Sequence, residues 1–330
     1  MHNSSLLNNI VTYLPKKNLT NEDLARVFNV QPEQIFKTVG VNQRHISGED
    51  ELASDMGIQA AQRLLKESDI SKDDIDFLIF CSTCFDYSAP STSCIMQDKI
   101  GLSKSTACID LPYGCSGYVY GLAMAKSFIS SGIAKNILFI TSDTLTKTIT
   151  ENNLELKSIF SDAASATLIT QKNSRSIGEF VFGTDGGGSL DVFVSKSGYR
   201  PPIDGNIDAC GILPHGKLEM DGMKVFNFGL KIVPQLITDT LKKNDLTLDQ
   251  IDLFIFHQPS RFLLDVLRKK INIPESKFFI NIEQHGNTSS TSIPLALSDA
   301  QAQGKLKHGM IVLLAGFGVG YSWAGTIIKT

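Results

Sequence analysis

The sequence predicts an α/β fold in which one arrangement of strands and helices is present twice. The first observation is a repeat: Asp69–Phe80 and Asp245–Phe256 each lead from a polar loop into an apolar strand. The second is a matched pair of helices further along the chain, and the third is a matched pair of strands after those helices. The positions with the same residue in both copies are, numbered in the first copy, Asp69, Asp73, Ile75, Asp76, Ile79 and Phe80.

The matched helices begin near Cys115 and Asn287, each directly after a glycine, Gly114 or Gly286. Each small-residue pattern ends at a second glycine, at the same spacing in both copies. Cys115 and Asn287 therefore occupy equivalent positions at two helix starts, and a pseudo-two-fold relation places these starts face to face.

The strand patterns are apolar on both faces, as in residues 136–142 and 310–315, which are the strands matched after the helices. Helical patterns such as Ala53–Glu67 and Phe228–Lys242 separate the strands. This alternation predicts parallel or mixed sheets covered by helices. A polar stretch after the strand Ala166–Thr170 marks the boundary, so we expect an N-terminal half at 1–172 and a C-terminal half at 173–330.

The charge balance excludes several classes of partner. The 330 residues include 31 basic and 34 acidic ones, and the basic residues form no block that could follow a phosphate backbone, so we expect no nucleic-acid partner. The N-terminal residues do not have the layout of a secretory signal, and no apolar run approaches the length of a membrane span. We therefore expect a cytosolic protein.

Six cysteines without regular spacing indicate reduced thiols rather than a disulfide framework. Cys81 and Cys84 form a lone pair without a second pair at metal spacing, so no metal site is predicted. We interpret the remaining cysteines apart from Cys115 as packing residues; they are Cys84, Cys94, Cys108 and Cys210.

Cys115 lies in Tyr113–Gly117, between a buried strand and a helix of small residues. A thiol at a helix N-terminus meets the positive end of the helix dipole, which favours the thiolate that a nucleophile needs. A small buried thiol is the simpler interpretation of Gly-Cys-Ser-Gly alone. The repeat makes a catalytic nucleophile the better interpretation of Cys115.

His257 follows the second copy of the repeated strand, and ligand sites in such sheets gather at the carboxyl ends of strands. Asn287 lies on the neighbouring loop, where a helix cap is the simplest role for it. His285 is a competing candidate that ranks below His257, because it lies in a loop rather than at a strand end.

The glycine run Gly316–Gly320 is followed by a strand pattern rather than a helix, which excludes a phosphate-binding loop. Glycines between two strands can instead bring backbone N–H groups close to a reacting carbonyl, and Val319 is the expected donor.

With these residues in this order, the sequence resembles the thiolase superfamily, and most closely the β-ketoacyl-ACP synthase III family, over nearly its whole length. The segments that carry the resemblance are Gly40–Ile46, Ala89–Cys94, Asp110–Gly117, Phe160–Ala166, Met220–Gly222 with Val225–Phe226, His257–Gln258, Gly286–Ser289 with Ile293–Pro294, and Phe317–Trp323.

The resemblance implies αβαβα-layered halves with two mixed five-stranded sheets. It also implies a catalytic set of Cys115, His257 and Asn287. Cys115 accepts an acyl group from an acyl-CoA or acyl-ACP, His257 and Asn287 bind the thioester oxygen while malonyl-ACP loses carbon dioxide, and the N–H groups of Cys115 and Val319 form the oxyanion hole. No metal or redox cofactor is implied. An acyl carrier protein and a second copy of the chain, in a homodimer, are the implied partners.

The sequence departs from the family pattern at several positions. Gln34 and Thr38 occur where relatives commonly have the Trp and Arg that hold the adenine of coenzyme A, and Arg261 is displaced relative to a cofactor-binding arginine. Ala89 occurs where a Phe often closes the acyl pocket. Ala89 and Phe317 are the candidates for lining or gating that pocket. These departures favour a specialised pathway over fatty-acid initiation, and leave both CoA and a carrier protein open as acyl donors.

Three other functions remain open at this point. The strongest is an acyltransferase that uses Cys115 but passes the acyl group to a hydroxyl or amine. The second is a non-catalytic partner of a true condensing enzyme. A cysteine hydrolase ranks lowest, because no carboxylate is evident that would orient the histidine as a general base.

Overall fold

Two mixed five-stranded sheets run through the molecule, one in each half of the chain. The computed structural model describes residues 10–195 and 216–330, without the side chains of residues 174 and 175. In spatial order, the first sheet contains β1 (Ile10–Tyr13), β7 (Ala163–Thr170), β6 (Asn136–Asp143), β4 (Phe77–Cys81) and β5 (Ala107–Leu111). In the corresponding order, the second contains β8 (Val181–Thr184), β14 (Ser322–Lys329), β13 (Ile311–Gly318), β11 (Leu253–Phe256) and β12 (Phe278–Phe279).

The two sheets have the same topology, which confirms the predicted duplication. In the first sheet β6, β4 and β5 are parallel, while β7 is antiparallel to both β6 and β1. In the second, β13, β11 and β12 are parallel, while β14 is antiparallel to both β13 and β8. The chain leaves the first sheet at Thr170 and enters the second at Val181. The division into domains at residues 172 and 173 stays a prediction.

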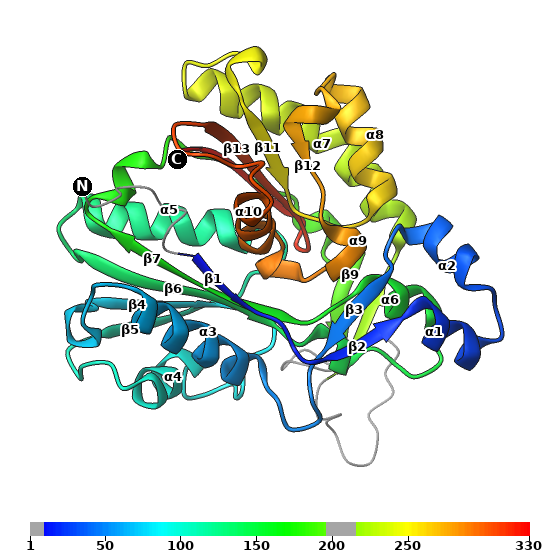
Figure 1. Cartoon of the computed structure of the whole chain (residues 1–330), viewed down its shortest axis with the longest axis horizontal. Helices are drawn as coiled ribbons and strands as arrows, with labels where there is room; N and C mark the ends of the chain where they lie inside the picture. The colour runs from blue at the N-terminus through cyan, green and yellow to red at the C-terminus, as the bar shows by residue number, and fades with distance from the viewer. Residues whose placement is uncertain (1–9, 196–215) are drawn as a thin grey trace.

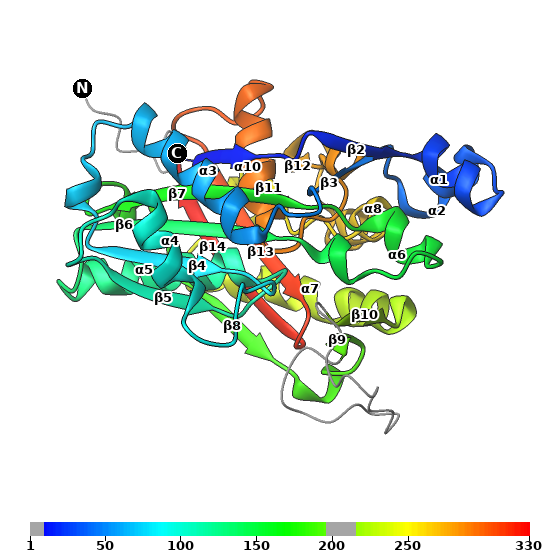
Figure 2. The same cartoon turned by 90° about the horizontal axis from the view of Figure 1, so that it is seen from below.

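Helices cover both faces of each sheet, in the layer order α, β, α, β, α (Figure 1, Figure 2). The outer face of the first sheet packs against α3 (Ala53–Glu67) and α4 (Thr92–Ile100). The outer face of the second packs against α7 (Gly222–Lys243) and α8 (Arg261–Ile271). Because β6 is buried on both faces, its residues 137–140 form a continuous apolar run instead of alternating with polar ones.

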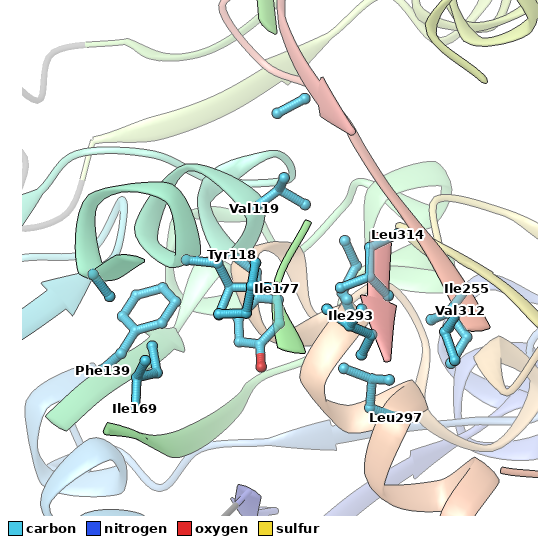
Figure 3. Packing of buried hydrophobic residues seen from close by; sticks show 14 of the residues in the cluster. Tyr118, Val119, Phe139, Ile169, Ile177, Ile255, Ile293, Leu297, Val312 and Leu314 are labelled. Atoms are coloured by element: carbon cyan, nitrogen blue, oxygen red, sulfur yellow. The ribbon is translucent and has the colours of Figure 1, made fainter. Parts of the chain in front are cut away.

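The middle layer consists of α5 (Gly117–Ser130) and α10 (Ser292–Ala302), which lie between the two sheets (Figure 3). Both helices are rich in small and apolar residues, because each faces packed side chains on most of its circumference. The layer holds the two helix starts, and with them the candidate site, at the centre of the molecule. Figure 3 shows the packing around this layer. The labelled side chains of the two helices are Tyr118, Val119, Ile293 and Leu297, and those of the sheets that pack against them are Phe139, Ile169, Ile255, Val312 and Leu314.

The remaining elements surround one side of this core. They are β2 (Lys17–Thr20), α1 (Asn21–Phe28), α2 (Pro32–Val39), β3 (Gln43–Ile46), α6 (Leu154–Ile159), β9 (Val192–Ser195), β10 (Lys217–Met220), α9 (Ile282–His285) and short 3₁₀ turns.

The structure differs from the sequence prediction at the start of one helix. The periodicity predicts a helix over Phe228–Lys242, whereas α7 begins at Gly222, because the side chain of Asp221 accepts a hydrogen bond from the backbone of Lys224 and caps it there. Within the described residues, no helix combines the length and apolar character needed to cross a membrane.

The inner helix α5 lies close to β6 because Gly121 has no side chain. A Cβ at Gly121 would lie 2.1 Å from Cζ of Phe139, and Tyr118 one turn earlier stacks on the same ring at 5.4 Å between centroids. The phenyl ring therefore fills the space that a side chain on the helix would need, and fixes how deeply α5 sits between the sheets.

We predict that Gly121→Ala destabilises the protein, despite the higher helix propensity of alanine, because the new methyl group overlaps the ring of Phe139. Overpacking of this kind costs about 1–3 kcal/mol, which urea unfolding followed by circular dichroism can measure. Gly186→Ala is the matched control, since a Cβ there would meet nothing within 4 Å. Equal stability of the two variants would contradict the packing argument.

Candidate active site

Cys115 lies in the turn between β5 and α5, and this turn is enclosed by residues of the second half. Gly114 is buried, and a Cβ on it would lie 3.0 Å from Oγ of Ser289 and 3.0 Å from Cγ1 of Val319. A side chain at this position would press on both segments, which glycine avoids. Cys115 itself keeps partial exposure.

The glycine end of β13 lies directly against Cys115. A Cβ at Gly318 would lie 2.6 Å from Sγ of Cys115, and one at Gly316 would lie 2.8 Å from Cα of Ser116. This close approach brings two backbone N–H groups to the sulfur, those of Val319 and of Cys115 itself. The glycine run thus has the place expected for it, beside the candidate nucleophile.

The structure corrects the expected ionisation of Cys115. Burial raises the pKa of the Cys115 thiol to about 11 and the charge of Asp143 adds to this rise, while hydrogen bonds from the two N–H groups oppose it. The helix start was expected to favour the thiolate. The structure instead favours the neutral thiol, because burial of the sulfur raises its pKa by more than the hydrogen bonds from the two N–H groups lower it.

His257 follows β11 and is held in place by three contacts. Its backbone N–H donates to the carbonyl of Ala315 on β13, its ring Nδ1 lies 2.7 Å from Oγ of Ser292, and its ring meets that of Phe317 edge-on at 5.8 Å. The side chain is buried, which lowers the pKa of His257 to about 3. The imidazole is therefore neutral at physiological pH.

Asn287 is also buried, but it does not lie at a helix start as the sequence predicted. A 3₁₀ turn follows it and α10 begins only at Ser292, so the Asn287 side chain makes a local turn instead, in which Oδ1 accepts from the N–H of Ser289 at 2.9 Å. The backbone of Asn287 bridges to Phe160 in the first half. With Oδ1 engaged, Nδ2 is the end of the amide that can donate to a ligand.

These contacts bring the three predicted residues into one region. The turn of Cys115 touches Gly318, whose neighbour Phe317 meets His257. On the other side, Gly114 touches Ser289, which is held by Asn287. Phe317 is buried beside the site, whereas Ala89 is exposed on this single chain, in the loop before α4.

Two residues that the sequence interpretation missed support this region. Ser292 contacts the imidazole of His257. Asp143, at the carboxyl end of β6, is buried and accepts hydrogen bonds from Thr83 of the first half and Ser290 of the second. The pKa of Asp143 is raised, because burial has a larger effect than these hydrogen bonds, which lower it. Its place at a strand end, the criterion used for His257, was the available signal.

Comparison with known proteins identifies the family. The model of 3-oxoacyl-[acyl-carrier-protein (ACP)] synthase III matches residues 109–186, and the C-terminal model of the same enzyme matches residues 241–330. The β-ketoacyl-[acyl-carrier-protein] synthase III of Clostridium tetani is 35% identical over 325 residues, 96% of each chain. The chain belongs to the β-ketoacyl-ACP synthase III family. It is thus a condensing enzyme of the acyltransferase class with a thiolase-like fold.

Solved structures agree with this assignment. A 3-oxoacyl-(acyl-carrier-protein) synthase III crystal structure matches with a TM-score of 0.92 and 37% identity, covering 98% of both chains. The priming β-ketosynthase of the R1128 polyketide pathway matches with a TM-score of 0.89 and 26% identity, over 98% of this chain and 95% of that one. The synthase III fold therefore extends over nearly the whole chain.

Three of the positions predicted to depart from the family pattern lie on α2 and α8. Gln34 and Thr38 are both exposed on α2. Arg261, at the start of α8, packs under Gly40 and forms ion pairs with Asp265 and Glu283. Its charge is thus already paired with two carboxylates of the same chain.

His285, the competing histidine, has a different set of partners. Its Nε2 lies 2.7 Å from Oδ2 of Asp299, and its Nδ1 lies 3.4 Å from Nε2 of His45. Asn281 donates to the same carboxylate oxygen and, through its own N–H, to Gln258, the neighbour of His257. Asp299 therefore connects His285, at the end of α9, through Asn281 with Gln258, the residue after His257.

The other cysteines only partly fit the interpretation as packing residues. Cys84 and Cys108 are partly buried, and burial raises the pKa of Cys84 to about 12 and that of Cys108 to about 11. Cys94 is exposed on α4, so it does not pack in the core. Cys210 lies outside the described residues.

We predict that alkylation of Cys115 by iodoacetamide depends steeply on pH. Because the pKa is raised, the rate should increase about tenfold per pH unit from about pH 7 to about pH 10, without a plateau. Mass spectrometry of the peptide containing Cys115, in a Cys94→Ser background that removes the exposed thiol, measures this rate. A plateau at or below neutral pH would show instead that the helix start dominates.

Proposed function

We propose that this synthase III transfers an acyl group from a thioester to Cys115 and condenses it with a malonyl thioester, with His257 and Asn287 assisting the decarboxylation. The observation that carries the proposal is the close approach of the glycine end of β13 to the turn of Cys115, where a Cβ at Gly318 would lie 2.6 Å from Sγ and the backbone N–H groups of Val319 and Cys115 lie beside the sulfur. An acyl group on that sulfur places its carbonyl beside two donors, which together form an oxyanion hole.

In the first step, Sγ of Cys115 attacks the carbonyl carbon of the incoming thioester. The negative charge that develops on the carbonyl oxygen is stabilised by the two N–H groups. The bond to the departing sulfur then breaks, and that sulfur takes up one proton as Cys115 loses one. The raised pKa of Cys115 fits such an exchange, because the resting enzyme keeps an unreactive thiol until a thioester occupies the site.

In the second step, the malonyl thioester loses carbon dioxide and its thioester oxygen becomes an enolate oxygen. His257 is neutral, and Ser292 can donate its hydroxyl proton to Nδ1, which leaves a proton on Nε2 to donate to that oxygen. Nδ2 of Asn287 is the second donor. Each such donor in a dry site lowers the barrier by roughly 3 kcal/mol.

The enolate carbon then attacks the acyl carbonyl on Cys115. A carbon–carbon bond forms, the bond to Sγ breaks, and the sulfur takes a proton to regenerate the thiol. The partner of His257 is the hydroxyl of Ser292 rather than a carboxylate, which supports condensation over a cysteine hydrolase. The chemistry requires no metal or redox cofactor.

The proposed partners follow from the family. The names of the relatives specify an acyl carrier protein, and we propose that such a carrier delivers the malonyl group in the cytosol. Gln34 and Thr38 on α2, and the paired charge of Arg261, support carrier delivery of the acyl group as well.

We predict that Cys115→Ala abolishes the acyl adduct seen by intact-protein mass spectrometry. His257→Ala and Asn287→Ala should still acquire the adduct, but carbon dioxide release from a malonyl thioester should fall by about 10²–10³, the usual cost of losing an oxyanion donor. The exposed His308→Ala is the control and should behave as wild type. Normal carbon dioxide release by either variant would remove that residue from the mechanism.

The same assay distinguishes the other candidate functions. An acyltransferase that uses a hydroxyl or amine acceptor would load Cys115 without releasing carbon dioxide, and a non-catalytic partner would do neither.

We also predict that the chain is a homodimer. In the described part of the chain, β5 has a strand partner on one side only, β4, so its other edge is available to a second copy. Sedimentation equilibrium should give about twice the 36.1 kDa of the single chain. A monomer at micromolar concentration would contradict this prediction.

A further inference from the structure

We infer that Ser116 and Ser322 form a hydrogen-bonded hydroxyl chain that positions Val319, and that this chain sets the acyl-transfer rate of the enzyme. The inference rests on the proposed function, in which the N–H of Val319 is an oxyanion donor. It assigns a positioning role to two serines on opposite halves of the molecule.

The contacts are short and buried. Oγ of Ser116 lies 2.7 Å from Oγ of Ser322, and Oγ of Ser322 lies 2.8 Å from the carbonyl oxygen of Val319. Ser116 is 1% exposed and Ser322 is 2% exposed, so bulk water does not compete for these hydrogen bonds. The hydroxyl chain thus begins at Ser116, next to the candidate nucleophile, and ends on the carbonyl of Val319, the residue whose N–H is the candidate oxyanion donor.

The direction of the chain follows from the chemistry of its members. A carbonyl oxygen only accepts, so Ser322 must donate its single hydroxyl proton to Val319. The hydroxyl oxygen of Ser322 can then only accept from its other neighbour, so Ser116 is the donor in that pair. Ser322 is therefore the essential member, and Ser116 supports it.

Val319 is held on both sides by these contacts. On its N-terminal side, Gly318 lies over Cys115 so closely that a side chain there would overlap the sulfur. On its C-terminal side, its carbonyl is bound by Ser322, which pairs with Gly318 across the β13–β14 hairpin. A hairpin tip fixed at both ends keeps the backbone of Val319 beside Cys115.

Oxyanion holes depend on such fixed donors, because a donor that must reorient during the reaction loses much of its effect. In the described part of the chain, the two hydroxyls form hydrogen bonds with each other and with the carbonyl of Val319, and none with the side chain of His257 or Asn287. Their removal should therefore change acyl transfer while leaving the chemistry of His257 and Asn287 intact.

The test compares single-turnover acyl loading in four variants and the wild type, using acyl-CoA or acyl-ACP and intact-protein mass spectrometry. Ser322→Ala should slow loading by about tenfold or more, and Ser116→Ala by only about threefold, because loss of one buried hydrogen bond at the donor itself has the larger effect. Ser322→Thr keeps the hydroxyl and should load within about threefold of wild type. Ser165→Ala is the matched control, since it removes a buried hydroxyl at 2.8 Å from Thr141 without touching the hairpin, and should load normally.

A second measurement separates positioning from general damage. In a Cys115→Ala background, which forms no acyl enzyme, adding Ser322→Ala should leave carbon dioxide release from malonyl thioester within about twofold. In the otherwise wild-type enzyme, Ser322→Ala should slow alkylation of Cys115 below about pH 10, because a displaced N–H group no longer lowers the thiol pKa.

Wild-type loading by Ser322→Ala, or a larger effect of Ser116→Ala, would overturn the inference. So would equal losses in acyl loading and carbon dioxide release. The alkylation rate needs no substrate, so it tests the hydroxyl chain even if the enzyme proves not to decarboxylate malonyl thioesters. That outcome would refute the proposed function alone.

Discussion

The close contact between the glycine end of β13 and the turn of Cys115 is the constraint on which the site depends. No side chain separates the two segments at Gly316 and Gly318. The contact brings the N–H of Val319 to the sulfur and, one residue away, places Phe317 against His257. A larger residue at either glycine would move the strand away from the turn, and the two halves would no longer meet at the reacting atoms.

This contact also explains why the site carries so little charge. The sulfur is shielded between two backbone segments, and the imidazole of His257 is buried, so burial favours the neutral form of both groups. The buried carboxylate of Asp143 binds donors from both halves and opposes a second negative charge nearby. In a site of this kind, hydrogen-bond donors stabilise charge only when it develops on a substrate.

The sequence was sufficient to predict the duplicated α/β fold, because repeated strands and matched helix spacings are local patterns. It also predicted that Cys115 lies just before a helix and that His257 follows a strand, since helix starts and strand ends follow from those patterns. It failed where tertiary packing decides. The late start of α10, the hydroxyl partner of His257 and the raised pKa of Cys115 all depend on which distant segments meet. The exposure of Cys94 has the same origin, because it depends on which face of α4 the sheet covers.

The connection between the halves has a consequence for how the protein matures. Cys115 comes from the N-terminal half, whereas His257, Asn287 and Val319 come from the C-terminal half. In the proposed mechanism, a nascent or partly denatured chain in which β13 has not yet docked has Cys115 and its own N–H group but lacks the N–H of Val319 beside the sulfur. We therefore expect acyl loading of such a chain to be slow until β13 and β14 of the second sheet are in place.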